Sequence, residues 1–118
     1  MFDEVLQRVM KTVGGVTCVL LAGRDGMVVA AAVGEGGPSP DLIAASMADL
    51  FRKAAAALAD AELGLPAELI LGGAAGHMVL REVAPGYLLA ASLAPSASLG
   101  RTRFELRKAA TTLEPELV

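Results

Sequence analysis

Aromatic residues are scarce in this 118-residue sequence, where they make up 3% of the chain and tryptophan is absent. Modules that stack nucleic-acid bases depend on exposed rings, so the composition disfavours that class of protein. Basic residues are also outnumbered by acids, and the net charge is −3 at pH 7. The chain has no overall positive field for a polyanion, and we expect no nucleic-acid partner.

Cysteine and long apolar runs are lacking as well. The only cysteine, Cys18, excludes a disulfide or a Cys-based metal site within the chain and favours a reducing cytoplasm. Gly, Pro or charged residues interrupt every apolar run before the ~20 residues that span a bilayer. The start of the chain, with Asp3 and Glu4, is unlike an export signal. We therefore expect a cytoplasmic protein without membrane insertion.

Small aliphatic residues are abundant instead. Hydrophobic residues make up 54% of the sequence, so the core must be built from Val, Leu, Ala and Met. The length suits one core and is too short for two, which predicts a single domain over residues 1–118.

Hydrophobic periodicity predicts three helices and five strands. Spacings of three and four residues indicate helices over 2–13, 41–64 and about 96–113, the last ended by Pro115. Short apolar runs indicate strands over 16–22, 27–33, 67–73, 77–83 and 87–93. Asp25-Gly26 marks a tight hairpin between the first two strands, which are apolar on both faces, as a sheet covered on both sides requires. The predicted order is α-β-β-α-β-β-β-α.

The central helix carries two apolar stripes at 100° per residue. One holds large side chains, among them Met47 and Phe51, and would face the core. The neighbouring stripe consists of Ala44, Ala48, Ala55 and Ala59. Burial deep inside one domain would explain it, but a short chain has few layers, so we favour packing against a second copy.

Groups able to carry chemistry are few. His77 is the only histidine and has no Asp or Cys at ligand spacing, and Cys18 alternates with apolar neighbours as a core residue does. No serine lies in a Gly-x-Ser-x-Gly context, and the glycine-rich stretches lack the Lys-Ser/Thr of a phosphate loop. We expect no catalytic residue, cofactor or metal, and hence no enzyme.

Two basic features allow two interpretations each. The last helix is locally basic because of Arg101, Arg103, Arg107 and Lys108. These residues form either a solvated helix face or a docking surface for an acidic partner. Arg24 at the hairpin tip is interpreted first as a turn residue, although an arginine finger can be imagined there.

The order of elements resembles the roadblock/dynein light chain family, in its bacterial, MglB-like form. The residues that carry the resemblance are the hairpin over 20–29, Gly14-Gly15, Ala44-Ala45, the Gly76-His77 turn and Leu99-Gly100-Arg101. The resemblance covers essentially the whole chain. It implies a profilin-like sandwich, with a five-stranded antiparallel sheet between the central helix on one face and the terminal helices on the other.

The resemblance also implies a homodimer in which the central helices pack together and the third strands pair edge to edge. The interface residues expected on this basis are Ala44, Ala48, Arg52, Ala55, Ala59, Leu69 and Leu71. Family members in bacteria are associated with Ras-like small GTPases, as activators or scaffolds, and activators are thought to reposition the GTPase's own catalytic residues. The expected function is therefore binding of such a GTPase and modulation of its GTP hydrolysis. The alternative is a non-catalytic scaffold or assembly subunit of a signalling or motility complex. A small-ligand sensor is disfavoured because few polar groups converge among the strands.

Overall fold

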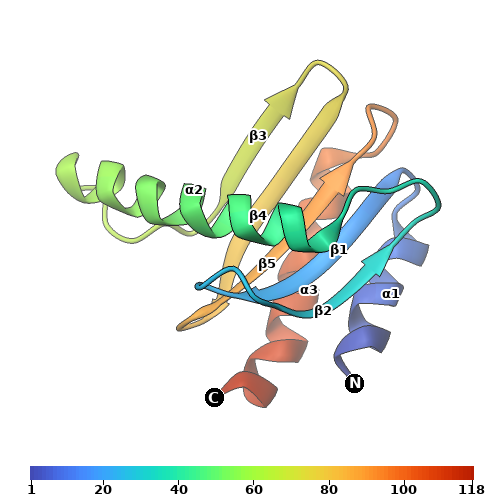
Figure 1. Ribbon diagram of the computed structural model, residues 1–118, viewed down its shortest axis with the longest axis horizontal. Coiled ribbons are helices and arrows are strands. Elements are labelled where there is room, and N and C mark those ends of the chain that lie inside the picture. Colours follow the sequence, from blue (N-terminus) through green and yellow to red (C-terminus); the bar gives the residue numbers. More distant parts are fainter.

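The computed structural model describes all 118 residues and has the predicted order of elements (Figure 1). The helices are α1 (Phe2–Thr12), α2 (Pro40–Asp60) and α3 (Leu99–Leu117). The strands are β1 (Val16–Gly23), β2 (Val28–Val33), β3 (Leu69–Gly73), β4 (Gly76–Ala84) and β5 (Tyr87–Leu93). The predicted order of three helices and five strands is thereby confirmed.

The β1–β2 hairpin forms for the reason that its sequence suggests. Gly26 has a φ of +87°, a conformation that glycine adopts without steric cost. The Asp25 carboxylate accepts a hydrogen bond from the Met27 amide at 3.0 Å, and the Gly23 amide donates to the Met27 carbonyl at 2.9 Å. The Asp-Gly turn thus reverses the chain.

All five strands form one antiparallel sheet in the order β2-β1-β5-β4-β3. The interior strand β1 is buried on both faces, as expected. The same expectation for β2 is wrong, because β2 is an edge strand in which only Ala32 is fully buried. The two free edges of the sheet are therefore β2 and β3.

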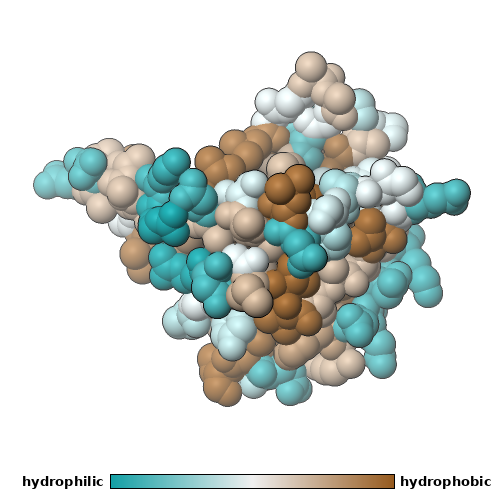
Figure 2. All heavy atoms as spheres, in the orientation of Figure 1, coloured by the Kyte–Doolittle hydropathy of each residue, from teal (hydrophilic) through white to brown (hydrophobic).

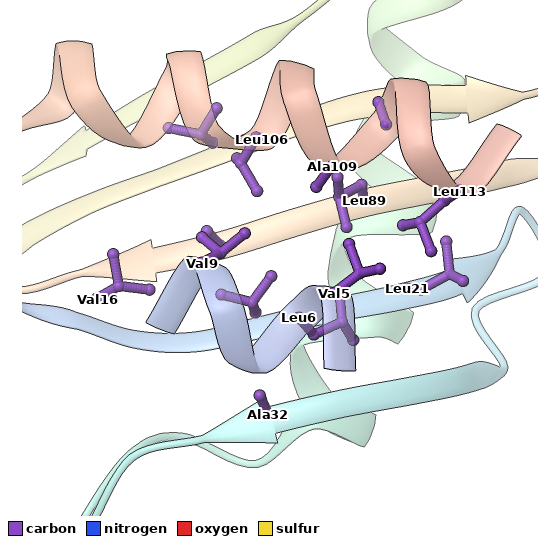
Figure 3. Packing of buried hydrophobic residues seen from close by; sticks show 14 of the residues in the cluster. Val5, Leu6, Val9, Val16, Leu21, Ala32, Leu89, Leu106, Ala109 and Leu113 are labelled. Carbon is purple, nitrogen blue, oxygen red and sulfur yellow. The ribbon is translucent and has the colours of Figure 1, made fainter. Parts of the chain in front are cut away.

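Helices cover the sheet on both faces. On one face α1 and α3 pack side by side over a cluster that includes Leu6, Leu21 and Leu106 (Figure 3). On the other face α2 crosses the strands and buries Met47 and Phe51 against them (Figure 1). The predicted distribution of helices over the two faces is confirmed.

The helix ends differ from the prediction in two places. The central helix ends at Asp60, four residues before Gly64. The last helix continues through Pro115 to Leu117, because a proline so near the end removes only one intrahelical hydrogen bond. Its start is capped by Ser98, whose hydroxyl accepts a hydrogen bond from the Arg101 amide at 3.1 Å. No helix is both long and apolar enough to cross a membrane.

Candidate interaction surfaces

The alanine stripe of α2 lies partly inside the subunit. Ala44 and Ala48 are 1% and 6% exposed and belong to the cluster beneath α2, together with Met47 and Phe51. The expectation that Ala44 and Ala48 face a second copy is therefore wrong, because the sheet of their own chain already covers them. The two stripes predicted from the sequence are one broad face, and the small alanines let the helix approach the strands closely.

That face continues beyond the sheet. Ala55 follows Ala48 by seven residues, so it lies on the same side of the helix two turns later. From Arg52 to Asp60, a segment that we call the α2 overhang, no residue is fully buried. Ala54, Ala55 and Leu58 are half-buried, and Ala59 is exposed. Figure 1 shows this half of α2 projecting past the edge of the sheet formed by β3.

Strand β3 is an unprotected edge beside the α2 overhang. Its residues Leu69–Gly73 include no charge and no proline, the usual means of blocking an exposed edge. Ile70 and Leu71 are 41% and 37% exposed, whereas Leu69 is half-buried against the cluster beneath α2. Figure 2 shows apolar side chains gathered over β3 above α2. Of the expected interface residues, Ala55 and Ala59 therefore lie on the α2 overhang, and Leu69 and Leu71 lie on the edge strand that it passes.

An open groove of about 510 Å³ lies next to this edge. Leu71 and Met78 form its apolar wall, and they face each other across β3 and β4. Its hydroxyl groups come from Thr17 and Ser92, whose side-chain oxygens lie 2.7 Å apart. Because these hydroxyls bond to each other, the groove presents few free polar groups and suits apolar side chains better than a polar small molecule.

Arg52 sits at the start of the α2 overhang and is exposed. It is ion-paired with Asp49, one turn earlier on the same helix. Lys53 also reaches Asp49, at 3.1 Å, and its hydrogen bond is the main cause that lowers the pKa of the Asp49 carboxyl. The expected interface residue Arg52 thus has a partner within its own chain.

Arg24 is held against the subunit at the hairpin. Its guanidinium carbon lies 5.1 Å from the centre of the Phe51 ring, and its Nη1 lies 3.9 Å from a carboxylate oxygen of Glu82. Its backbone amide donates to the carbonyl of Gly86 at 2.9 Å. These contacts join the hairpin to α2 and to the β4–β5 turn, and they favour the interpretation of Arg24 as a turn residue.

The four basic residues expected to dock a partner do not act alike. Arg103 donates to both oxygens of Glu68, with Nη2 at 2.7 Å and Nε at 3.0 Å. This hydrogen bond, opposed by partial burial, lowers the pKa of the Glu68 carboxyl. Arg103 therefore ties α3 to the start of β3. Arg101, Arg107 and Lys108 are exposed on the outer side of α3.

The groups considered for chemistry lie apart from one another. Cys18 is buried in the cluster beneath α2, and burial raises the pKa of its thiol. His77 is half-buried at the start of β4, opposite Gly72 and Leu93. No group of three His, Cys, Asp or Glu side chains is placed to hold a metal ion.

The sequence interpretation overlooked Phe104, which is 54% exposed among the basic residues of α3. The signal was present in the sequence: Arg101, Arg107 and Lys108 stand three and four residues from Phe104, and helix positions at those spacings are neighbours.

Comparisons with known proteins agree with this architecture. A family model described as Roadblock/LC7 domain matches residues 1–92. The Roadblock/LC7 domain from Streptomyces avermitilis superposes with a TM-score of 0.89 at 18% identity, covering 98% of this chain and 96% of that chain. MglB from Myxococcus xanthus superposes with a TM-score of 0.88 at 17% identity, covering 98% of this chain and 94% of that chain. Profilin II from Acanthamoeba castellanii superposes with a TM-score of 0.72 at 14% identity, covering 100% of each chain.

No curated protein matches this sequence. At identities this low the solved structures show the fold alone, whereas the family model spans most of the chain. The chain therefore belongs to the Roadblock/LC7 domain family, whose members are non-catalytic regulatory and adaptor proteins.

Proposed function

We propose that this protein is a homodimeric regulator that binds a Ras-like small GTPase and modulates its GTP hydrolysis, without an active site of its own. One observation supports the dimer: the apolar face of α2 is longer than the sheet beneath it and continues past the uncharged edge formed by β3. The GTPase as partner follows from the resemblance to bacterial family members. The free thiol of Cys18 is compatible with a cytoplasmic location.

The dimensions of the overhang suit a two-fold dimer. The nine residues Arg52–Asp60 are about 13 Å long at the helical rise of 1.5 Å per residue. Neighbouring strands are about 4.8 Å apart, so this length spans between two and three strands. If the two β3 edges pair, each overhang lies over β3 and β4 of the other subunit. Within one subunit α2 packs mainly on β1, β2 and β5, which leaves Leu71 exposed and Met78 only half-buried for that contact.

The proposed effect on hydrolysis is conformational. Arg24 of the hairpin already contacts Phe51 and Glu82 of its own chain. An arginine-finger mechanism, in which Arg24 would reach the transition state, therefore has less support than a mechanism in which the switch regions of the GTPase change conformation. A dimer that binds the hydrolysis-competent arrangement more tightly would shift the GTPase toward it.

Single-turnover GTP hydrolysis tests the proposal, with the Ras-like GTPase encoded in the same genome measured with and without this protein. We expect a rate increase that saturates with the concentration of the dimer. Ala59→Glu, designed to give monomers, is the matched control and should lose the stimulation. Absence of both binding and stimulation would refute the proposed function.

A scaffold is the second candidate. A two-fold dimer presents every remaining surface twice, and the outer side of α3 lies on the opposite face of the sheet from α2 (Figure 1). Binding of the GTPase without any change in hydrolysis would favour this candidate.

A further inference from the structure

Phe104 stands on the side of α3 that points away from the sheet. The buried residues of α3 define its inner side: Thr102, Glu105, Leu106, Ala109, Ala110 and Leu113. At 100° per residue, Phe104 lies nearly opposite the middle of this set. The residue is 54% exposed, although the chain has only three phenylalanines. An aromatic side chain in this position contributes little to its own core.

Cations surround this ring. Positions three and four residues away on a helix are its nearest surface neighbours, and for Phe104 these are Gly100, Arg101, Arg107 and Lys108. Three of the four are positively charged, and the fourth has no side chain. The Lys108 ammonium lies 5.5 Å from the centre of the ring. We call these residues, with Phe104, the α3 patch.

The positive charge of the α3 patch is only partly compensated within the chain. Lys108 lies 3.7 Å from Glu105, which faces inward toward α1. Arg101 and Arg107 have no ion-pair partner, in contrast to Arg103, which Glu68 holds. The guanidinium groups of Arg101 and Arg107 are therefore exposed and open to an external anion. The patch is also basic in a chain with a net charge of −3.

We propose that the α3 patch docks a protein partner through an acidic, amphipathic segment. An apolar side chain of the partner would pack on Phe104, and its carboxylates would pair with Arg101 and Arg107. Aromatic residues and arginines supply most of the binding energy in protein interfaces, and complementary charge adds specificity and speed of association. The proposal goes beyond the proposed function, because the patch lies on the opposite side of the sheet from the α2 overhang.

An anionic membrane fits the patch less well. Helices that bind bilayers insert a broad apolar stripe, whereas the apolar stripe of α3 is buried in its own core. Phe104 is the single large apolar side chain on the outer side of α3, where Gly100 and Thr111 flank it. A single ring with three cations suits a peptide better than a lipid surface.

A labelled synthetic helix tests the proposal against the full-length protein. The probe carries Leu at intervals of three and four residues and Glu at the remaining positions, and binding is followed by fluorescence anisotropy at low and high salt. The reference probe has the same composition in a scrambled order that abolishes the apolar stripe. We expect the amphipathic probe to bind more tightly than the scrambled one, and its affinity to fall as salt rises.

Two variants separate docking from folding. Phe104→Ala should weaken binding by roughly 30-fold or more, the loss expected for an interface hot spot, while alanine keeps the helix intact. Arg101→Glu reverses a charge of the patch but places a glutamate three residues after the capping Ser98, an arrangement that stabilises helix starts. We therefore expect Arg101→Glu to lose binding with an unchanged or higher melting temperature. Lys11→Glu, an exposed charge reversal on α1, is the matched control and should retain binding.

Other outcomes would overturn the proposal. Equal binding of the scrambled probe, or unchanged affinity in Phe104→Ala, would mean that charge alone attracts the peptide. Binding to phosphatidylserine vesicles that exceeds binding to the probe would assign the patch to a membrane instead. The monomeric Ala59→Glu variant should bind the probe as the wild type does. Probe binding therefore tests the α3 patch even if the proposed dimer is refuted.

Discussion

Replacing Ala59 by glutamate is expected to separate the dimer without unfolding the subunit. Ala59 is exposed in the single chain and lies on the face of the α2 overhang that would cover the other subunit. Glutamate differs from alanine by only a few tenths of a kcal/mol in helix propensity, so the isolated subunit should keep its melting temperature. In the dimer, the new carboxylate would meet the apolar surface around Leu71 and Met78.

The magnitude follows from desolvation and symmetry. An unpaired charge withdrawn from water costs several kcal/mol, and we take about 2–3 kcal/mol because an interface at a sheet edge stays partly wet. A two-fold dimer carries the substitution twice, which gives about 4–6 kcal/mol. At 1.4 kcal/mol for each factor of ten, the dimer dissociation constant should rise roughly 10³- to 10⁴-fold.

Light scattering after size exclusion, repeated over a dilution series, measures this change directly. Ala57→Glu is the matched control, since Ala57 is also exposed but lies on the other side of α2. We expect monomers for Ala59→Glu and dimers for Ala57→Glu, with similar melting temperatures. A dimer of wild-type strength in Ala59→Glu would refute the overhang as the interface, and monomeric wild-type protein would refute the dimer itself.

Three further variants test particular contacts. Glu68→Gln should lower the free energy of unfolding by about 1–2 kcal/mol near neutral pH, toward the low end because Arg103 is partly exposed. Since the folded-state pKa of Glu68 is lowered, this stability is present above the unfolded pKa of about 4.3 and is lost as pH falls through the folded value. Denaturation curves along a pH series should show the unfolding free energies of the variant and the wild type converging in acid. A difference that stays constant with pH would contradict the ion pair. Gly76→Ala should lower the free energy of unfolding by about 2–4 kcal/mol, measured by chemical denaturation, because Gly76 has a φ of +148° and a Cβ there would overlap the Leu93 carbonyl oxygen. An unchanged free energy of unfolding would contradict this close approach. Arg24→Ala should keep any stimulation of GTP hydrolysis in single-turnover assays while losing about 0.5–1 kcal/mol of stability, and loss of stimulation would assign Arg24 as an arginine finger.

Local patterns in the sequence were sufficient for the elements and for a sheet covered on both faces, whereas the family resemblance supplied which helices lie on which face. Asp25-Gly26 specified the first hairpin, because that dipeptide adopts the turn without help from distant residues. The unbroken apolar run of β1 required cover on both faces, and helices supply it on each side. The basic character of α3 could also be read directly, since its residues are close together in the chain.

Only the tertiary structure decided which of these residues remain available to a partner. Whether an alanine of α2 is covered depends on where the sheet ends, and so Ala48 is buried whereas Ala59 is exposed on the same helix. Arg103 is removed from the basic face by Glu68, which is 35 residues distant in the chain. Periodicity reports the faces of one element at a time, whereas exposure and pairing are set by contacts between elements far apart in sequence. The sequence by itself therefore determined the fold and the family resemblance, and the packing of α2 and α3 determined which surfaces are left to bind.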